Sequence, residues 1–189
     1  KIRKLLLSKE AFRRLSGAAH KYGVNKLRIS GAEPTLGKEH LLSLLEYIED
    51  SRFILFILET NGILFGADKH YVQEVSKFNK VHVRVSLKAG TTESFKMKTG
   101  ANQEAFELPF QAIRNLEKQG VSFHVAAMSL DPRIMGPEER RNLLDKLRSI
   151  SPSYAVNLEE EVVDPYETTL TRLEKAGKKL EWPLKRAYK

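Results

Sequence analysis

The chain has 189 residues and a net charge of +8 at pH 7, from 32 Lys and Arg against 24 Asp and Glu. It contains no cysteine, which excludes disulfide bridges and thiolate-bound metals built from its own residues. Its apolar runs are too short to cross a bilayer, so we expect a cytoplasmic protein without membrane contact.

Strand-like and helix-like patterns alternate along the chain with a period of about thirty residues, which is typical of βα units. Ser8 is expected to cap the first helix and Gly23 to end it. Helices are predicted over 8–22, 38–49, 68–78, a segment ending at Gly120, a segment opening at Pro137, and 166–179. Strands are predicted over 26–30, 53–58, 81–87, 122–128 and 154–158, with a polar loop over 88–102.

Consecutive crossovers of this kind predict an α/β fold with a parallel sheet and right-handed connections. The unbroken apolar segment 53–58 is expected to be buried on both faces. Because the helix 8–22 has no strand before it, the first strand of the architecture is expected upstream of Lys1. We expect residues 1–165 to form one domain, followed by a C-terminal helix and basic tail over 166–189.

The strand 26–30 ends in the sequence Ser30-Gly31-Ala32-Glu33-Pro34. Glycine allows a close backbone approach to a ligand, and proline fixes its own φ and holds the preceding residue extended. The turn therefore predicts a rigid shelf whose carbonyls, with the Glu33 carboxylate at the rim, accept hydrogen bonds from an ammonium group. Taken alone, such a Gly- and Pro-containing turn is also common in loops that bind no ligand.

Two further strands end in polar residues. Thr60 and Asn61 follow the strand 53–58 within the sequence Glu59-Thr60-Asn61-Gly62, and Ser86 and Lys88 end the strand 81–87. Ser86 and Lys88 share one direction by the two-residue alternation of a strand. A lysine that points inward there needs an anionic partner. Met128, at the end of the strand 122–128, contacts an adenine or fills the core.

The remaining polar residues are not assigned to a ligand site. The sequence Glu159-Glu160-Glu161 is interpreted as an acidic solvated turn, which could place one carboxylate in the pocket. The histidines share no ligand spacing and are interpreted as surface or packed residues: His20, His40, His70, His82 and His124. We assign no catalytic and no metal-ligating residue.

The three strand ends, in this order and at these separations, resemble the radical S-adenosylmethionine (SAM) superfamily, over about residues 24–130. The resemblance is closest to its glycyl-radical activating-enzyme-like branch and related archaeal proteins. Residues 31–34 resemble the family's Gly-Gly-Glu-Pro motif, with Ala32 for the second Gly. Glu59 replaces Asp in an Asp-Thr-Asn-Gly signature, and Ser86 replaces Asp in an Asp-x-Lys pair.

The resemblance implies an incomplete (β/α)6, TIM-like partial barrel. In the family, a [4Fe-4S] cluster held by a Cys-x-x-x-Cys-x-x-Cys loop reduces SAM to a 5′-deoxyadenosyl radical. By likeness, Gly31 to Pro34 would hold the methionine amino group, Thr60 and Asn61 would line the pocket, and Ser86 and Lys88 would lie near the carboxylate or ribose. The cluster ligands would belong to a longer parent protein, and this chain would be an inactive fragment.

The resemblance does not identify the substrate, and a protein and a nucleic acid both stay open. The alternative hypothesis is that the chain is a cysteine-free α/β binding module, which binds RNA or another polyanion through its basic tail, residues 178–189. A solvated basic surface explains the same charge. A metabolic (β/α) enzyme with phosphate sites is disfavoured, because no Gly-rich phosphate fingerprint follows any strand.

Overall fold

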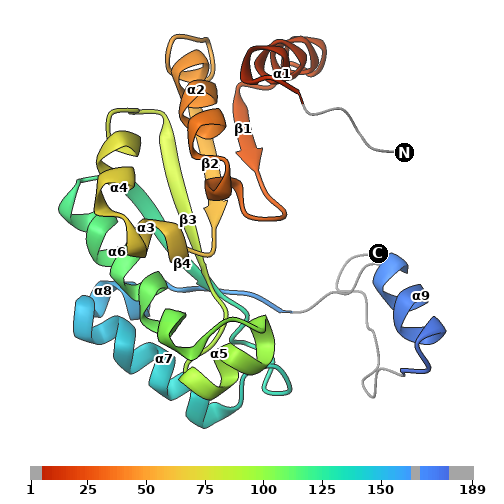
Figure 1. The fold of residues 1–189 in the computed structure, drawn as a ribbon, viewed down its shortest axis with the longest axis vertical. Coiled ribbons are helices and arrows are strands. Elements are labelled where there is room, and N and C mark those ends of the chain that lie inside the picture. The colour runs from red at the N-terminus through yellow and green to blue at the C-terminus, as the bar shows by residue number, and fades with distance from the viewer. Residues whose placement is uncertain (1–5, 163–166, 179–189) are drawn as a thin grey trace.

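The structure, a computed structural model, describes residues 6–162 and 167–178. Its centre is one parallel sheet in which the strands stand in sequence order (Figure 1). The strands are β1 (Lys26–Ile29), β2 (Leu55–Thr60), β3 (Val81–Leu87), β4 (Ser122–Ala127) and β5 (Glu159–Glu160). Each pairs in parallel only with its sequence neighbours in the described ranges, so the sheet stays open between β1 and β5. The predicted α/β class and the TIM-like partial barrel are confirmed.

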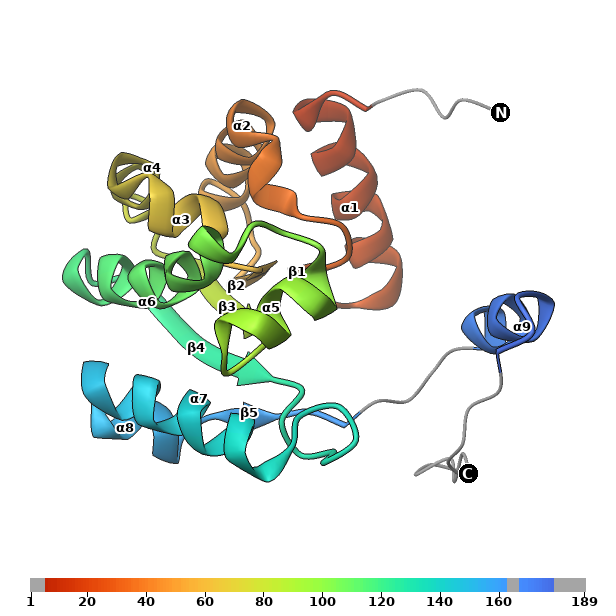
Figure 2. The same cartoon turned by 60° about the horizontal axis from the view of Figure 1, so that its bottom comes forward.

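The helices are α1 (Ser8–Tyr22), α2 (Lys38–Glu49), α3 (Ile63–Ala67), α4 (Lys69–Val75), α5 (Thr92–Thr99), α6 (Leu108–Lys118), α7 (Pro137–Ile150), α8 (Pro152–Val156) and α9 (Glu167–Lys175). Of these, α1 to α4 and α6 to α8 form an outer layer that follows the curve of the sheet, and α5 lies near the carboxyl ends of the strands (Figure 2). No helix in the described part of the chain is long and apolar enough to cross a membrane.

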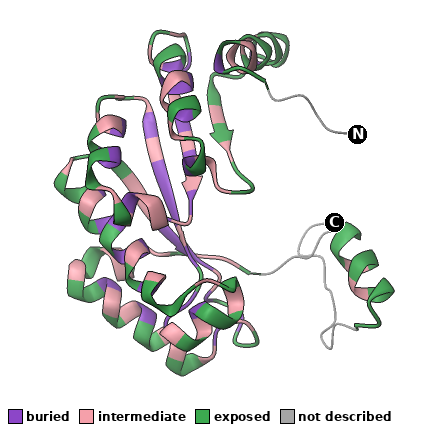
Figure 3. Cartoon of the chain, viewed as in Figure 1, coloured by how far each residue is buried: buried purple, intermediate pink, exposed green. Residues whose placement is uncertain are grey.

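The two faces of the sheet differ in character. Along β2, Phe56, Leu58 and Thr60 are buried, whereas Ile57 and Glu59 between them are only partly covered. Figure 3 shows the same banding of buried and partly buried residues along the central strands. The expectation that residues 53–58 are buried on both faces is therefore wrong: the helix layer covers one face, and the other faces the hollow of an open half-barrel.

Several predicted elements differ from the structure. The segment 154–158 is not a strand, because Pro152 opens the short helix α8 and the fifth strand begins only at Glu159. The predicted loop 88–102 contains α5, whose first turn is capped by the Thr91 hydroxyl. Glu159 and Glu160 form β5 rather than an acidic turn.

Helix boundaries follow their capping residues. The predicted helix 68–78 is preceded by a separate helix α3, and the Asp68 carboxylate caps α4 by accepting from the His70 amide. Ser8 does not cap α1; its hydroxyl bonds instead to Nδ1 and the carbonyl of His40. Gly23 ends α1 in the left-handed conformation, as predicted.

Candidate functional site

A cavity of about 390 Å³ opens at the carboxyl ends of the strands. Its lining gathers eight of the predicted site residues and three others: Gly31, Ala32, Glu33, Glu59, Thr60, Asn61, Arg84, Ser86, Lys88, Met128 and Glu161. Two predicted residues do not line it. Ser30 is exposed, and Pro34 begins a 3₁₀ turn that extends to Leu36.

The shelf after β1 has an unusual backbone. Gly31 has a φ of 85° and Ala32 a φ of 51°, so two successive residues lie in the left-handed region. Of the described non-glycine residues, Ala32 is the one with positive φ. A Cβ in this region costs about 1–2 kcal/mol. The methyl group of Ala32 therefore strains the turn.

The Glu33 carboxylate is already occupied by the protein. Oε1 accepts from the hydroxyls of Thr35 at 2.6 Å and Thr60 at 2.7 Å and from the Thr35 amide at 3.2 Å, and Oε2 accepts from the Asn61 amide at 2.8 Å. Its carboxylate therefore ties the shelf to the end of β2. That Glu33 also accepts a hydrogen bond from the ammonium group of a ligand stays a prediction.

The turn after β2 is held by its own side chains. Thr60 accepts from the Gly62 amide at 3.0 Å, and Asn61 Oδ1 accepts from the Ile63 amide at 2.9 Å. Gly62 has a φ of 79°, and a Cβ there would lie 3.2–3.3 Å from Val85, Ala112 and Pro109. Thr60 and Asn61 thus line the cavity while serving mainly to shape its wall.

Ser86 and Lys88 point the same way, as the strand alternation predicted. The Lys88 ammonium donates to Ser86 Oγ at 2.7 Å, and in residues 6–162 and 167–178 this is its one hydrogen-bond partner. Lys88 stays accessible as a residue, but the groups crowded around its ammonium desolvate it and lower its pKa. A cation that lacks a carboxylate within reach is ready to bind an anionic group of a ligand.

Sequence reasoning missed Arg84, which is 6% exposed and lies beneath the cavity. Its guanidinium forms a bidentate pair with Glu159 at 2.9 and 3.0 Å and reaches Glu161 at 2.6 Å and Glu59 at 3.5 Å. Arg28 of β1 also bonds to Glu59. The alternation of His82, Arg84 and Ser86 with valines in β3 is the signal that could have placed Arg84 on the inner face.

The lining has three carboxylates, Glu33, Glu59 and Glu161, and two cations, Arg84 and Lys88, which leaves one net negative charge. The two cations differ in their partners: within the described part of the chain Lys88 has no carboxylate partner, whereas Arg84 has several. The cavity therefore suits a small ligand that carries an anionic group and an excess of positive charge.

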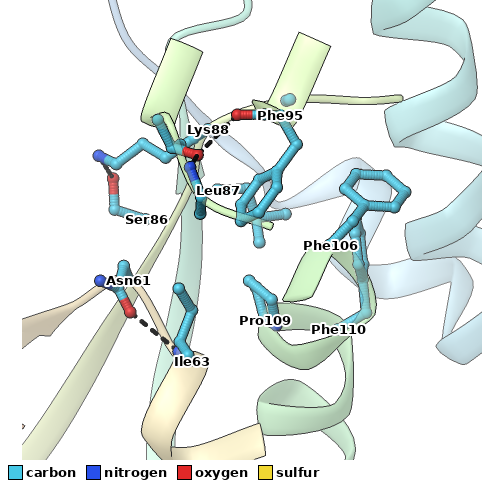
Figure 4. Close-up of a pocket in the computed structure, with 12 residues that line it drawn as sticks. Asn61, Ile63, Ser86, Leu87, Lys88, Phe95, Phe106, Pro109 and Phe110 are labelled. Carbon is cyan, nitrogen blue, oxygen red and sulfur yellow. Dashed lines mark hydrogen bonds between the residues drawn. The ribbon is translucent and has the colours of Figure 1, made fainter. Parts of the chain in front are cut away.

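A second, apolar pocket of about 260 Å³ adjoins the cavity on the helix side of β3 (Figure 4). The two share Asn61, Ser86 and Lys88. Figure 4 shows Phe95, Phe106 and Phe110 across from Ser86, toward which the Lys88 ammonium turns.

A model of the radical SAM superfamily matches residues 2–150 of the chain. The chain belongs to this superfamily. A probable GTP 3′,8-cyclase of Thermoplasma volcanium is 30% identical over 96 residues, which are 51% of this chain and 28% of that protein. A probable GTP 3′,8-cyclase of Methanococcus aeolicus is 34% identical over 86 residues, which are 44% of this chain and 28% of that protein.

A solved structure of a cobalamin-dependent S-adenosylmethionine radical enzyme, OxsB, has the same fold with a TM-score of 0.55. The two sequences are 12% identical, and the superposition covers 90% of this chain and 25% of the OxsB chain. The predicted superfamily is thus confirmed. The two relatives above are named GTP 3′,8-cyclases, and neither name points to the expected activating-enzyme-like branch.

The residues present do not fit the superfamily's iron–sulfur cluster. The chain has no cysteine to supply a thiolate. The described residues also hold no group of three or more His, Asp or Glu side chains that could bind a metal ion. These residues can therefore form a site for SAM but not for the cluster.

Proposed function

We propose that the cavity at the carboxyl ends of β1 to β4 is a SAM-binding site. The observation that carries this proposal is the Lys88 ammonium, which lines the cavity with no carboxylate partner among the described residues. SAM has a carboxylate for Lys88, and its ammonium and sulfonium give it one net positive charge. The single net negative charge of the lining complements that charge.

Each part of the ligand has a counterpart in the lining. The strained shelf at Gly31 and Ala32 offers backbone carbonyls to the methionine ammonium. Lys88 binds the carboxylate, with Ser86 as a neighbouring donor. Met128 offers an apolar contact to the adenine. Glu33, Thr60 and Asn61 hold the shelf and the neighbouring turn in place.

SAM supplies radical chemistry when an iron–sulfur cluster donates an electron to it. We propose that the cluster ligands belong to a longer protein, and that this chain alone binds SAM without cleaving it. The two matched relatives are also much longer than the matched part.

The substrate of the longer protein is a separate proposal. The relatives' printed name makes GTP the first candidate. Saturable conversion of GTP by a longer, cluster-containing protein would support it. Turnover of another substrate with GTP inert would refute it and leave the SAM site untouched.

Calorimetric titration tests the SAM site. We expect SAM to bind the chain, and S-adenosylhomocysteine, which lacks the sulfonium charge, to bind less tightly. Lys88→Met should weaken SAM binding about tenfold, because a charge-assisted hydrogen bond is lost. Lys118→Met is the matched control, since Lys118 is exposed on α6 away from the cavity. Equal affinities of the Lys88 and Lys118 variants would refute the assignment.

The polyanion-binding alternative stays a prediction. It depends on the basic tail, residues 178–189, and all of this tail except Lys178 lies outside the described residues. Part of the proposed C-terminal unit 166–189 lies outside them as well.

A further inference from the structure

A continuous row of hydrogen-bonded polar side chains crosses the inner face of the sheet toward the cavity. Ser122 Oγ lies 2.8 Å from His82 Nδ1, and His82 Nε2 lies 2.6 Å from His124 Nδ1. His124 Nε2 lies 2.7 Å from Glu159 Oε2. The two imidazole rings stack with their centroids 4.9 Å apart. From their spacing, both histidines are interpreted as surface or packed residues, and the parallel register of β3 and β4 brings the two together.

Glu159 is the shared member of this row. Its Oε2 atom meets both His124 Nε2 at 2.7 Å and Arg84 Nε at 2.9 Å. Arg84 then reaches Glu161 and Glu59, and all three of these residues line the cavity. Glu159 Oε2 therefore connects the histidine pair directly to the Arg84 guanidinium, so a change of charge on the histidines acts on this guanidinium through one atom.

The row accepts an extra proton without losing a hydrogen bond. In the neutral pattern, His124 donates to Glu159 and accepts from His82, which accepts from the Ser122 hydroxyl. When His82 Nδ1 is protonated, it donates to the same Ser122 oxygen, since a hydroxyl can rotate to accept. Burial and the neighbouring His124 lower the pKa of His82, which favours the neutral form of this ring.

We propose that Glu159 is a positioning residue that acts on the cavity through Arg84, and that a proton on the His82–His124 pair weakens the binding of a cationic ligand there. The ligand identity rests on the proposed function, with SAM as the cation. By linkage, binding of that ligand disfavours protonation of the pair.

The other charged groups near the row are accounted for. From β1, Lys26 and Arg28 share its face, and Arg28 is paired with Glu59 of β2. Glu33 and Lys88 stand at the cavity. Histidine is the side chain whose ordinary pKa lies between about pH 5.5 and pH 7.

The test measures SAM affinity by calorimetry at about pH 7 and pH 5.5. We expect the wild-type affinity to fall about two- to threefold at the lower pH, from the repulsion of two charges roughly 10 Å apart. The double variant His82→Asn, His124→Asn should lose this pH dependence, because neither imidazole of the pair remains to be protonated. His70→Asn, at an exposed position on α4, is the matched control and should keep it. Equal pH dependence in both variants would overturn the proposal.

A second measurement does not need the ligand. The ring C–H resonances of His82 and His124 can be followed by NMR as the pH is varied in the free chain. Glu159→Gln should lower the midpoint of the pair by about 1, because the carboxylate that favours the charged imidazole is gone. If Glu159→Gln leaves the titration midpoint of the histidine pair unchanged, the proposed coupling between Glu159 and the pair is wrong. If SAM fails to bind while the midpoint does move, the proposed function fails and the Glu159 link stands.

Discussion

At the scale of single residues, the strain at Ala32 leads to a direct prediction. Ala32→Gly removes the Cβ from a position with a φ of 51°. The relief is about 1–2 kcal/mol, and glycine gives back about 0.5–1 kcal/mol in chain entropy. We expect the free energy of unfolding to rise by about 0.5–1 kcal/mol in urea denaturation. A decrease would show that the turn does not hold Ala32 in the left-handed conformation.

Glu33 is the second residue whose role can be measured. Glu33→Gln keeps the size of the side chain but replaces one acceptor oxygen with an amino group, which leaves at least one of its donors unpaired. We expect a loss of about 2 kcal/mol in the free energy of unfolding. Glu46→Gln, on the exposed side of α2, serves as control and should change stability little. Equal effects of the two substitutions would contradict the role given to Glu33.

Much of the site could be predicted at this scale, because the carboxyl ends of parallel strands converge whatever the details of packing. Gly31, Thr60, Lys88 and Met128 were placed together in this way. Side-chain roles could not be predicted, since they depend on partners distant in sequence. Glu33 is occupied by residues about 27 positions away, as its bonds to Thr60 and Asn61 show.

At the scale of elements, the contact between α3 and α6 is the tightest test of packing. A Cβ at Gly66 in α3 would lie 1.9 Å from the Leu108 carbonyl oxygen at the start of α6. Gly66→Ala should therefore destabilise the protein by about 3 kcal/mol, because backbone must move. Gly17→Ala in α1 is the control: a Cβ there meets nothing within 4 Å, and the change should stabilise the helix by up to about 1 kcal/mol. Thermal melting that ranks the two the other way would contradict the packing.

The outcome for the elements has a physical pattern. Long amphipathic helices such as α1, α2 and α7 were predicted from their spacing, which local sequence largely determines. The short helices α5 and α8 were missed, because segments of five to eight residues give too few turns to show a period. The remaining signals were Thr91, which caps α5, and Pro152, the first residue of α8.

At the scale of the whole molecule, ion pairs at β5 predict how stability depends on pH. Arg84 lowers the pKa of Glu159 to about 2, and Arg140 lowers that of Glu160. A carboxyl group with a depressed pKa stabilises the fold above its ordinary value of 4.5 and loses that contribution as the pH falls toward its folded value. We expect the melting temperature to fall between about pH 4.5 and pH 2.

Two glutamate variants test the origin of this acid sensitivity, one at an ion pair of β5 and one on an exposed helix face as the control. Glu160→Gln should flatten the fall in melting temperature, because the substituted side chain no longer titrates against Arg140. Glu46→Gln should leave the curve as it is. A wild-type melting temperature that stays constant from pH 5 to pH 2 would contradict this account.

The most direct test of a SAM site in this cavity is to map where SAM contacts the chain, by backbone amide chemical shifts in an isotope-labelled sample. The account predicts that saturable shifts concentrate at residues 31–33, 60–61, 86–88 and 128, and that S-adenosylhomocysteine produces the same pattern at higher concentration. Shifts confined to other surfaces, or no saturable shift with either compound, would contradict it.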